Sequence, residues 1–221
     1  MDRARRVTRP RVVLLGGASG SGKSYLARRH GRPHLELDAY YHEISEDGVS
    51  GVLFPRTPYG EIDWDHPGTW NLQAAVDAVV ELIETGRTLM PDYSIATSSV
   101  VGTRLLELGD PSTSRSAEGD EPGHEVIIAE GVFADVAAEP LRAACSDLGV
   151  RLDAYYIDQH TVTTTARRFA RDVTERRKPI SFLIQRGWAL ARSERTSRAR
   201  HLDAGFIPVP KSRLRGGIPA D

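Results

Sequence analysis

The ranges Val12–Leu15 (VVLL) and Gly17–Ser24 (GASGSGKS) decide the fold. Four apolar residues in a row, two of them β-branched, predict a short buried strand. The second range has the spacing G-x-x-x-x-G-K-[ST] of a phosphate-binding loop, and the residues from Lys23 onward predict the helix that this motif requires. We therefore expect a strand, a glycine-rich loop and a helix in direct succession.

The residue types of the loop follow from the chemistry of phosphate binding. Glycine lets the backbone adopt positive φ angles and bring N–H groups close to phosphate oxygens, while the helix directs its positive dipole end at the same anion. Lys23 is expected to reach the β- and γ-phosphates of ATP, and the Ser24 hydroxyl is expected to hold Mg²⁺. The predicted nucleotide-binding residues are Gly17, Ala18, Ser19, Gly20, Ser21, Gly22, Lys23, Ser24 and Tyr25.

Length and composition limit the class of protein. With 221 residues, a formal net charge of −1 and 40% hydrophobic residues, the chain is expected to form a single α/β domain over residues 1–221. The balanced charge gives no overall attraction to nucleic acid or to a membrane surface, so an anion site must be local. The single cysteine, Cys145, excludes an intrachain disulfide and is expected to be buried.

Two targeting signals are missing from the sequence. No apolar run approaches the roughly 20 residues that span a bilayer. The basic arm at residues 1–10 is not followed by the apolar segment of a secretion signal. We expect a cytoplasmic protein whose partners are small molecules, and homo-oligomer formation stays open.

The rest of the chain alternates between strand and helix patterns. Strands are expected at 35–38, 126–130, 152–158 and 206–209, helices at 72–83, 141–148, 161–177 and 181–202, and an extended segment at 88–93. This alternation predicts a parallel sheet with helices on both faces, the three-layer α/β architecture of phosphate-loop nucleotide-binding proteins. In such sheets ligands bind at the carboxyl ends of the strands.

Two segments without regular periodicity interrupt this pattern. Residues 39–69 are rich in Gly, Pro and aromatic side chains, and a loop of this length indicates a functional, substrate-binding insertion. Residues 109–124 combine Gly, Ser, Pro and acidic residues, which is typical of a flexible surface insertion.

Two acidic residues stand at expected strand ends. Asp38 closes the strand at 35–38, where a carboxylate can orient and deprotonate an attacking hydroxyl; a turn or helix cap is the alternative. Glu130 closes the strand at 126–130 and is expected to ligate Mg²⁺, directly or through water, although an acid at a strand end is common in itself.

A basic helix is expected to form a lid at about residues 165–180. Arg168 and Arg171 lie on one face of this helix together with Asp172, and Arg171 pairs with Glu175. A solvated face or a nucleic-acid surface would have the same charge, but no aromatic interleaving accompanies it. In a phosphate-loop protein such a helix can neutralise the charge that develops on a transferred phosphoryl group.

Taken in order, these motifs resemble the uridine kinase–phosphoribulokinase group of phosphate-loop kinases, and uridine–cytidine kinases in particular. Besides the phosphate loop, the matching segments are Asp38–Tyr41, Trp64–Pro67, Pro91–Tyr93, Ile127–Gly131 and Arg168–Arg176. They are similar to the family's Asp-Ser-Phe-Tyr, Phe-Asp-His-Pro and Pro-x-Tyr segments, its strand ending in Glu-Gly, and its arginine-rich lid. The resemblance extends over most of the chain.

The resemblance implies a kinase that transfers the γ-phosphoryl group of ATP to the 5′-hydroxyl of a nucleoside, uridine or cytidine, with Asp38 as the general base. The implied catalytic residues are Lys23, Asp38, Arg168, Arg171 and Arg176, and Ser24 and Glu130 are the implied Mg²⁺ ligands. The implied substrate-binding residues are Asp38, Tyr41, Trp64, Asp65, Tyr93, Arg104 and Gln185. Ser98 stands where the family has its base-reading histidine, so a different small hydroxyl compound stays open as the acceptor.

A nucleotide-dependent switch or regulatory ATPase is the alternative from a different class. The only asparagine is Asn71, so the chain has no Asn-Lys-x-Asp guanine-reading motif, which argues against a conventional GTPase. An inactive nucleotide-binding module would be expected to lose Asp38 or the lid arginines, and the sequence retains both.

Overall fold

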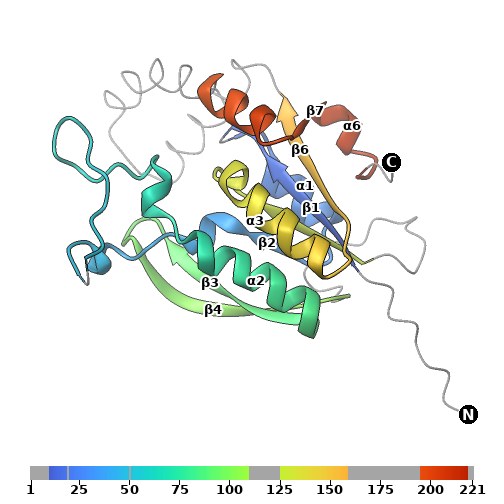
Figure 1. Cartoon of the computed structure of the whole chain (residues 1–221), viewed down its shortest axis with the longest axis horizontal. Coiled ribbons are helices and arrows are strands. Elements are labelled where there is room, and N and C mark those ends of the chain that lie inside the picture. Colours follow the sequence, from blue (N-terminus) through green and yellow to red (C-terminus); the bar gives the residue numbers. More distant parts are fainter. Residues whose placement is uncertain (1–9, 19, 50, 110–124, 159–194, 219–221) are drawn as a thin grey trace, which may run out of the picture.

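A computed structural model describes residues 10–18, 20–49, 51–109, 125–158 and 195–218 (Figure 1). Five strands form a parallel sheet in the order β2-β5-β1-β6-β7. Their bounds are β1 Arg11–Gly16, β2 His34–Glu36, β5 Val126–Glu130, β6 Leu152–Asp158 and β7 Ile207–Pro210. The principal helices are α1 (Lys23–His30), α2 (Leu72–Thr85), α3 (Ala134–Asp147), a helix at 195–203 and the short α6 (Lys211–Leu214).

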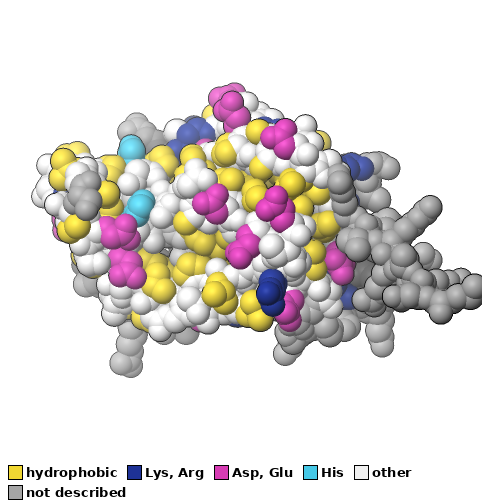
Figure 2. Space-filling view, turned by 60° about the horizontal axis from the view of Figure 1, so that its bottom comes forward, with side chains coloured by type: hydrophobic (Ala, Val, Ile, Leu, Met, Phe, Trp, Pro, Cys, Tyr) yellow, Lys and Arg dark blue, Asp and Glu magenta, His cyan; other side chains and the backbone are white. Residues whose placement is uncertain are grey.

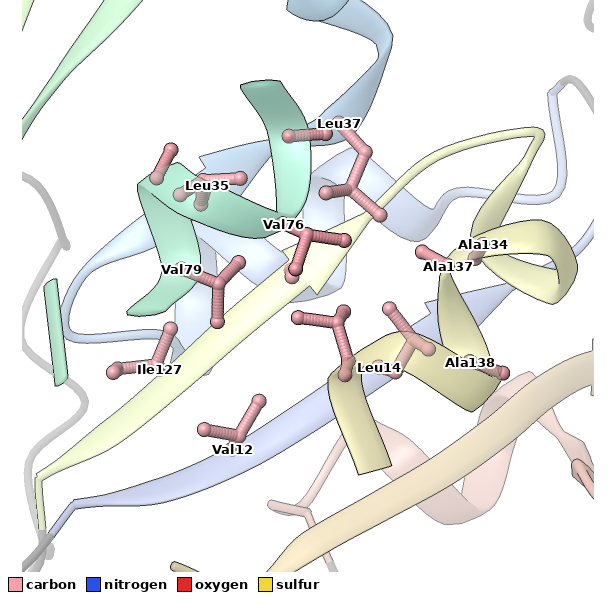
Figure 3. Packing of buried hydrophobic residues seen from close by; sticks show 14 of the residues in the cluster. Val12, Leu14, Leu35, Leu37, Val76, Val79, Ile127, Ala134, Ala137 and Ala138 are labelled. Atoms are coloured by element: carbon pink, nitrogen blue, oxygen red, sulfur yellow. The ribbon is translucent and has the colours of Figure 1, made fainter. Parts of the chain in front are cut away.

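The sheet is covered on both faces, which confirms the predicted three-layer architecture. Val12 and Leu14 of β1 pack with α2 and α3, whereas Val13 and Leu15 pack with α1 and α6, because successive side chains of a strand point to opposite faces. All four are fully buried. Figure 3 shows Val12 and Leu14 facing valines of α2 and the alanines of α3, whose small side chains let this helix approach the sheet closely.

Helix α2 begins and ends where capping chemistry predicts. The Asn71 side chain accepts a hydrogen bond from Ala74 N at 3.0 Å, which satisfies one free N–H of the first turn. Gly86 ends the helix with φ 77°, a left-handed conformation that glycine adopts without a Cβ penalty. The predicted helix at 72–83 and its glycine stop are therefore confirmed.

A two-stranded antiparallel ribbon lies outside the parallel sheet. It pairs β3 (Arg87–Ser94) with β4 (Ser99–Glu107), so the extended segment expected at 88–93 is a strand, although of a separate sheet. The sequence pattern missed β4, because Leu106 alone of its residues is buried and no apolar alternation marks it. Thr88 Oγ1 donates to Glu81 Oε2 of α2 at 2.6 Å and attaches the ribbon to the main layer.

Figure 2 shows the side of the molecule that faces down in Figure 1. Acidic side chains are scattered there among hydrophobic ones, and few basic side chains are in view. Leu89, Val101 and Leu105 of the ribbon are among the exposed apolar residues of the chain. The described part of this face has no concentration of positive charge.

The structure corrects two predicted boundaries. The strand expected at 35–38 ends at Glu36, and Leu37–Tyr40 forms a 3₁₀ turn, η1, because burying both Leu37 and Tyr40 requires a spacing of three residues. Helix α3 begins at Ala134 rather than Leu141, since its first turns bury only alanines and contain Pro140, which together hide the helical period.

Other predictions agree with the structure or lie outside its described part. The strands expected at 126–130, 152–158 and 206–209 correspond to β5, β6 and β7, and Cys145 is buried in the main core. The helix predicted at 161–177, the lid at 165–180 and most of the insertion at 109–124 lie outside the described residues, as does 181–194 of the last helix. In the described ranges, the helices are too short or too polar to cross a bilayer.

His201 connects the helix at 195–203 to the first strand. Its ring is fully buried between Tyr156 and Phe206, and a Cβ at Gly16 would overlap it. Ser197 O lies 2.7 Å from Nδ1, and Asp135 Oδ1 lies 3.7 Å from Nε2. Burial lowers the pKa of His201, with help from the charges of Lys23 and Arg200, and outweighs the opposing effects of Asp135 and Ser197.

This burial predicts a pH-dependent stability. The folded protein holds His201 neutral, whereas the unfolded chain binds a proton below about pH 6.5. Stability from this group is therefore complete above that pH and is lost as the pH falls below it. Urea unfolding at pH 7.5 and pH 5.5 should show a smaller loss on acidification for His201→Gln than for the wild type, and an equal loss would contradict the assignment.

Candidate active site

The glycine-rich loop lies between the carboxyl end of β1 and the start of α1. Gly17, Gly20 and Gly22 have φ angles of 149°, 83° and 95°, which only glycine adopts readily. No described side chain caps the N-terminus of α1, so its first N–H groups stay available to an anion. The Ser21 hydroxyl is fully buried and has no hydrogen-bond partner among the described residues.

Lys23 folds back over this loop. Its Nζ donates to Gly17 O at 2.8 Å and to Ala18 O at 3.4 Å, and its side chain is largely buried. The ammonium group is therefore held at the loop by carbonyl oxygens that a phosphate can replace. Of the predicted nucleotide-binding residues, Ser19 lies outside the described part of the chain.

Strand register brings the two predicted carboxylates to this loop. Leu15, at the end of β1, lies beside Glu130 of β5, and Glu130 in turn lies beside Glu36 of β2. Asp38 follows two residues later in η1, where its Oδ1 accepts a hydrogen bond from Val132 N at 2.8 Å. A Cβ at Gly131 would lie 2.7 Å from that same oxygen, so the position requires glycine.

The turn that carries Asp38 is fixed from behind. Trp70 Nε1 donates to Leu37 O at 2.7 Å, and Asn71 N donates to Tyr40 O at 2.8 Å. These bonds attach η1 to the segment just before α2. Asp38 therefore lies on a turn that is held in place, where it is half-buried and within reach of the charge of Lys23.

The two carboxyl groups have opposite pKa shifts. Burial, followed by the negative charge of Glu130, raises the pKa of Asp38 to about 6, while Lys23 and the Val132 N–H act in the opposite direction. Burial also acts to raise the pKa of Glu130, but the hydrogen bond with His34, the Ser24 side chain and the charge of Lys23 outweigh it and hold that pKa below its ordinary value. Glu130 thus stays ionised, and Asp38 is the group that can gain or lose a proton near neutral pH.

Glu130 and Ser24 fit the role of Mg²⁺ ligands. The Ser24 side chain acts to lower the pKa of Glu130, and Glu130 Oε2 is buried without a hydrogen-bond partner among the described residues. Magnesium favours one or two carboxylate ligands together with phosphate and water oxygens. The other Glu130 oxygen, Oε1, lies 3.2 Å from His34 Nε2.

His34 is a site residue that sequence reasoning missed. It is largely buried at the start of β2 and holds the Glu130 carboxylate, which lies 96 positions away in the chain. A lone histidine at the start of a strand has no local signal for such a contact, since the pairing of β2 with β5 alone creates it.

An aromatic cluster forms the wall next to Asp38. We use this name for Tyr41, Phe54, Trp64, Tyr93 and Phe133. The ring of Tyr41 lies 6.0 Å from Trp64, 5.8 Å from Tyr93 and 5.9 Å from Phe133 (centroid distances), and Phe54 lies 5.8 Å from Trp64. The sequence predicted Tyr41, Trp64 and Tyr93 at this site but missed the two phenylalanines, which have no polar group to mark them.

Asp38 and Asp65 both help to raise the pKa of Tyr41. Burial, and then the negative charges of Asp38 and Asp65, raise the pKa of Tyr41. The Tyr41 hydroxyl donates to Trp64 O at 3.3 Å, and Asp65 is exposed next to it in the chain. Tyr41 of the aromatic cluster is therefore close to one half-buried and one exposed carboxylate, and its role in substrate binding stays a prediction.

The ribbon holds the segment 39–69 in place. Tyr93 donates its hydroxyl hydrogen to His42 O at 3.0 Å, and Ser98 O accepts from Ile44 N at 2.9 Å. Ser98 has φ 48°, in the left-handed region, and its side chain acts to lower the pKa of Tyr93 against the larger, opposite effect of burial. Ser98 therefore supports the loop from the ribbon turn.

Of the remaining predicted site residues, Arg104 lies in the described part of the chain and four others do not. Arg104 lies on β4, and its Nη2 donates to Glu36 Oε1 at 3.4 Å, so it joins the ribbon to β2 beside the site. The predicted lid and post-lid residues Arg168, Arg171, Arg176 and Gln185 lie outside the described part of the chain.

Comparisons with known proteins agree with this geometry. The chain is 26% identical over 185 residues to a uridine kinase of Saccharomyces cerevisiae, a match that covers 80% of this chain and 32% of that protein. It is 25% identical over 188 residues to a uridine kinase of Ligilactobacillus salivarius, which covers 82% of this chain and 75% of that protein. The chain thus spans about a third of the yeast relative's length.

Two further comparisons complete this result. A gluconokinase structure from Sinorhizobium meliloti matches with a TM-score of 0.37 and 15% identity over 82% of this chain and 75% of that chain. No family model matches the sequence. The sequence matches and the phosphate-loop fold together support a uridine kinase-like phosphate-loop kinase.

The raised pKa of Asp38 predicts an unusual stability effect. The pKa of Asp38 is 3.8 in the unfolded chain and about 6 in the folded protein. Ionising this carboxylate therefore destabilises the fold, and the effect reaches its full size above about pH 6. Asp38→Asn should therefore raise the free energy of unfolding at pH 7.5, by about 1–3 kcal/mol, and change it little at pH 3.5. Urea titrations measure both values, with Asp92→Asn on the exposed ribbon as the control.

A loss of stability in Asp38→Asn at pH 7.5 would contradict this account. It would instead favour the alternative from the sequence, in which Asp38 only caps a turn through its bond with Val132 N.

Proposed function

We propose that this chain is an ATP-dependent kinase that transfers the γ-phosphoryl group to a hydroxyl of a small acceptor, a nucleoside such as uridine or cytidine. One observation carries the proposal. Lys23, Asp38 and Glu130 meet at the carboxyl edge of a parallel sheet, beside a glycine-rich loop whose helix N-terminus is uncapped by any described side chain. This is the combination of charges that phosphoryl transfer requires.

The phosphate loop binds the donor. The N-terminus of α1 would face the phosphate chain, and the Ser21 hydroxyl, which has no hydrogen-bond partner among the described residues, can donate to it. Lys23 releases its loop carbonyls and moves to the β- and γ-phosphates. Ser24 and Glu130 would hold Mg²⁺, which neutralises charge on the phosphates when it is bound.

Asp38 activates the acceptor. With a pKa near 6 it is ionised at neutral pH and still basic enough to take a proton from the attacking hydroxyl. Its bond to Val132 N leaves Oδ2 for the acceptor and fixes the carboxylate plane. The arginines at 168, 171 and 176 are proposed to complete the neutralisation of the transferred group from the lid.

The aromatic cluster favours a planar acceptor. Tyr41 lies close enough to Asp38 and Asp65 to respond to their charges, and Trp64 and Tyr93 pack against its ring. In the proposed complex these aromatic side chains contact the base, and Asp65 contacts the sugar hydroxyls. The named activity of both curated relatives supports a nucleoside. Ser98 lies close enough to Tyr93 of this cluster to affect its pKa, and the preferred base is left to experiment.

A panel assay tests the proposal. ADP release from Mg-ATP is measured alone and with uridine, cytidine, adenosine, guanosine, gluconate or glycerol, and the product is identified by mass. We expect uridine or cytidine to stimulate ADP release in stoichiometric agreement with a nucleoside monophosphate. Asp38→Asn should reduce the stimulated rate about 10²–10⁴-fold with little change in ATP affinity. Lys23→Ala should lower both the stimulated rate and the affinity for ATP. Asp92→Asn, a surface carboxylate of the ribbon, is the matched control.

The other outcomes separate the alternatives. Stimulation by a hydroxyl compound other than a nucleoside would keep the kinase and replace its acceptor. Slow ATP hydrolysis that no small molecule changes would contradict the kinase proposal and favour a regulatory ATPase. Full activity in Asp38→Asn would overturn the assignment of the base.

A further inference from the structure

The imidazole ring of His34 contacts one carboxylate closely and faces a second. Nε2 lies 3.2 Å from Glu130 Oε1, within hydrogen-bond distance, and Nδ1 lies 3.9 Å from Glu36 Oε1. The side chains of His34 and Glu130 are almost fully buried, whereas that of Glu36 is partly exposed. The contact with Glu130 is therefore both the closer and the better shielded from water.

Strand pairing places these two side chains on the same face of the sheet. In the pairing of β2 with β5, His34 lies opposite Ile128, and Glu36 lies opposite Glu130. Side chains two residues apart in a strand point to one face, and Ile128 packs with Leu26 of α1. His34 therefore lies on the α1 face and reaches one step along β5 to Glu130.

The hydrogen bond runs from the histidine to the carboxylate. An ionised carboxylate only accepts hydrogen bonds, so Nε2 carries the proton and donates it to Glu130 Oε1. The second oxygen, Oε2, is buried and has no hydrogen-bond partner among the described residues. A buried carboxylate oxygen without a partner is unfavourable, so one oxygen of Glu130 is left for a positively charged ligand.

We propose that His34 is a positioning residue for the metal site: by holding Oε1, it directs Oε2 of Glu130 toward Mg²⁺ and limits the carboxylate to one coordinating oxygen. This inference rests on the proposed function, since it takes Glu130 as a Mg²⁺ ligand. Magnesium requires a near-octahedral set of oxygen ligands, whereas Ca²⁺ accepts more oxygens and often takes both from one carboxylate. His34 therefore favours Mg²⁺ over Ca²⁺ at this site.

Metal affinities of His34 variants test the assignment. The wild type, His34→Leu and His34→Gln are saturated with adenosine 5′-(β,γ-imido)triphosphate, a non-hydrolysable ATP analogue. Dissociation constants for Mg²⁺ and Ca²⁺ are then measured by calorimetry, with the analogue alone as the reference titration.

We expect a selective loss that the conservative variant avoids. His34→Leu should weaken Mg²⁺ binding about 10–100-fold, the usual effect of removing a hydrogen bond that orients a metal ligand. Ca²⁺ should lose at least about 3-fold less, because a free Oε1 lets the carboxylate bind it through both oxygens. His34→Gln should stay within about 3-fold of the wild type, since its amide nitrogen is as many bonds from Cα as Nε2 and also donates.

Thr88→Val is the matched control. Thr88 is almost fully buried, and its hydroxyl donates to Glu81 Oε2 at 2.6 Å, so this variant also removes one buried hydrogen bond to a glutamate. It should lower the free energy of unfolding in urea and leave both metal affinities unchanged. If His34→Leu does not fold, His34→Asn replaces it, because its amide is one methylene shorter than that of Gln and should give the same selective loss.

Three results would overturn the assignment. Unchanged Mg²⁺ affinity in His34→Leu would exclude a role at the metal site, and an equal loss for Mg²⁺ and Ca²⁺ would make His34 a structural support for Glu130 alone. A loss in His34→Gln as large as that in His34→Leu would exclude the hydrogen bond as the cause.

The wild type separates this inference from the proposed function. If the wild type with the analogue binds no more Mg²⁺ than the analogue alone, the proposed function and this assignment both fail. Wild-type binding together with an unaffected Leu variant contradicts this assignment alone.

Discussion

The parallel register of β2, β5 and β1 is the constraint on which the site depends. It aligns Glu36 with Glu130 and Glu130 with Leu15, so the residues that follow each strand emerge at one edge of the sheet. Lys23 then lies within the electrostatic field of both Asp38 and Glu130. A slip of one residue in β5 would turn Glu130 to the other face and remove this arrangement, because side chains alternate along a strand.

The surroundings of the two carboxylates give them different roles. Glu130 has His34 as its hydrogen-bond partner, and Lys23 and Ser24 act to keep it ionised, whereas Asp38 has a single backbone donor and the repulsion of Glu130. Pairs of acids whose environments separate their pKa values are typical of sites that move a proton beside a fixed charge. The glycine at 131 supports this division, since any Cβ there would displace the Asp38 carboxylate.

Short sequence patterns were enough to predict the central strands and helices and the phosphate loop. The strand–loop–helix at 12–30, the capped helix α2 and strands β5 and β6 have patterns that are complete within a few residues. The contact of His34 with Glu130 has no such pattern, because the pairing of β2 with β5 creates it. Strand β4 was missed for a related reason: its side chains are almost all exposed, so packing leaves no period in its sequence.

The titration of Asp38 itself tests the central claim most directly. Carbon-13 NMR of the aspartate side-chain carboxyl groups, followed from pH 3 to pH 8 in the nucleotide-free protein, resolves each group. We predict one aspartate that titrates at about pH 6 and is missing from the Asp38→Asn spectrum. If the signal that disappears in Asp38→Asn titrates at or below about pH 4, the value of an ordinary aspartate, then Lys23 controls this carboxylate more strongly than burial and Glu130, and the account is wrong.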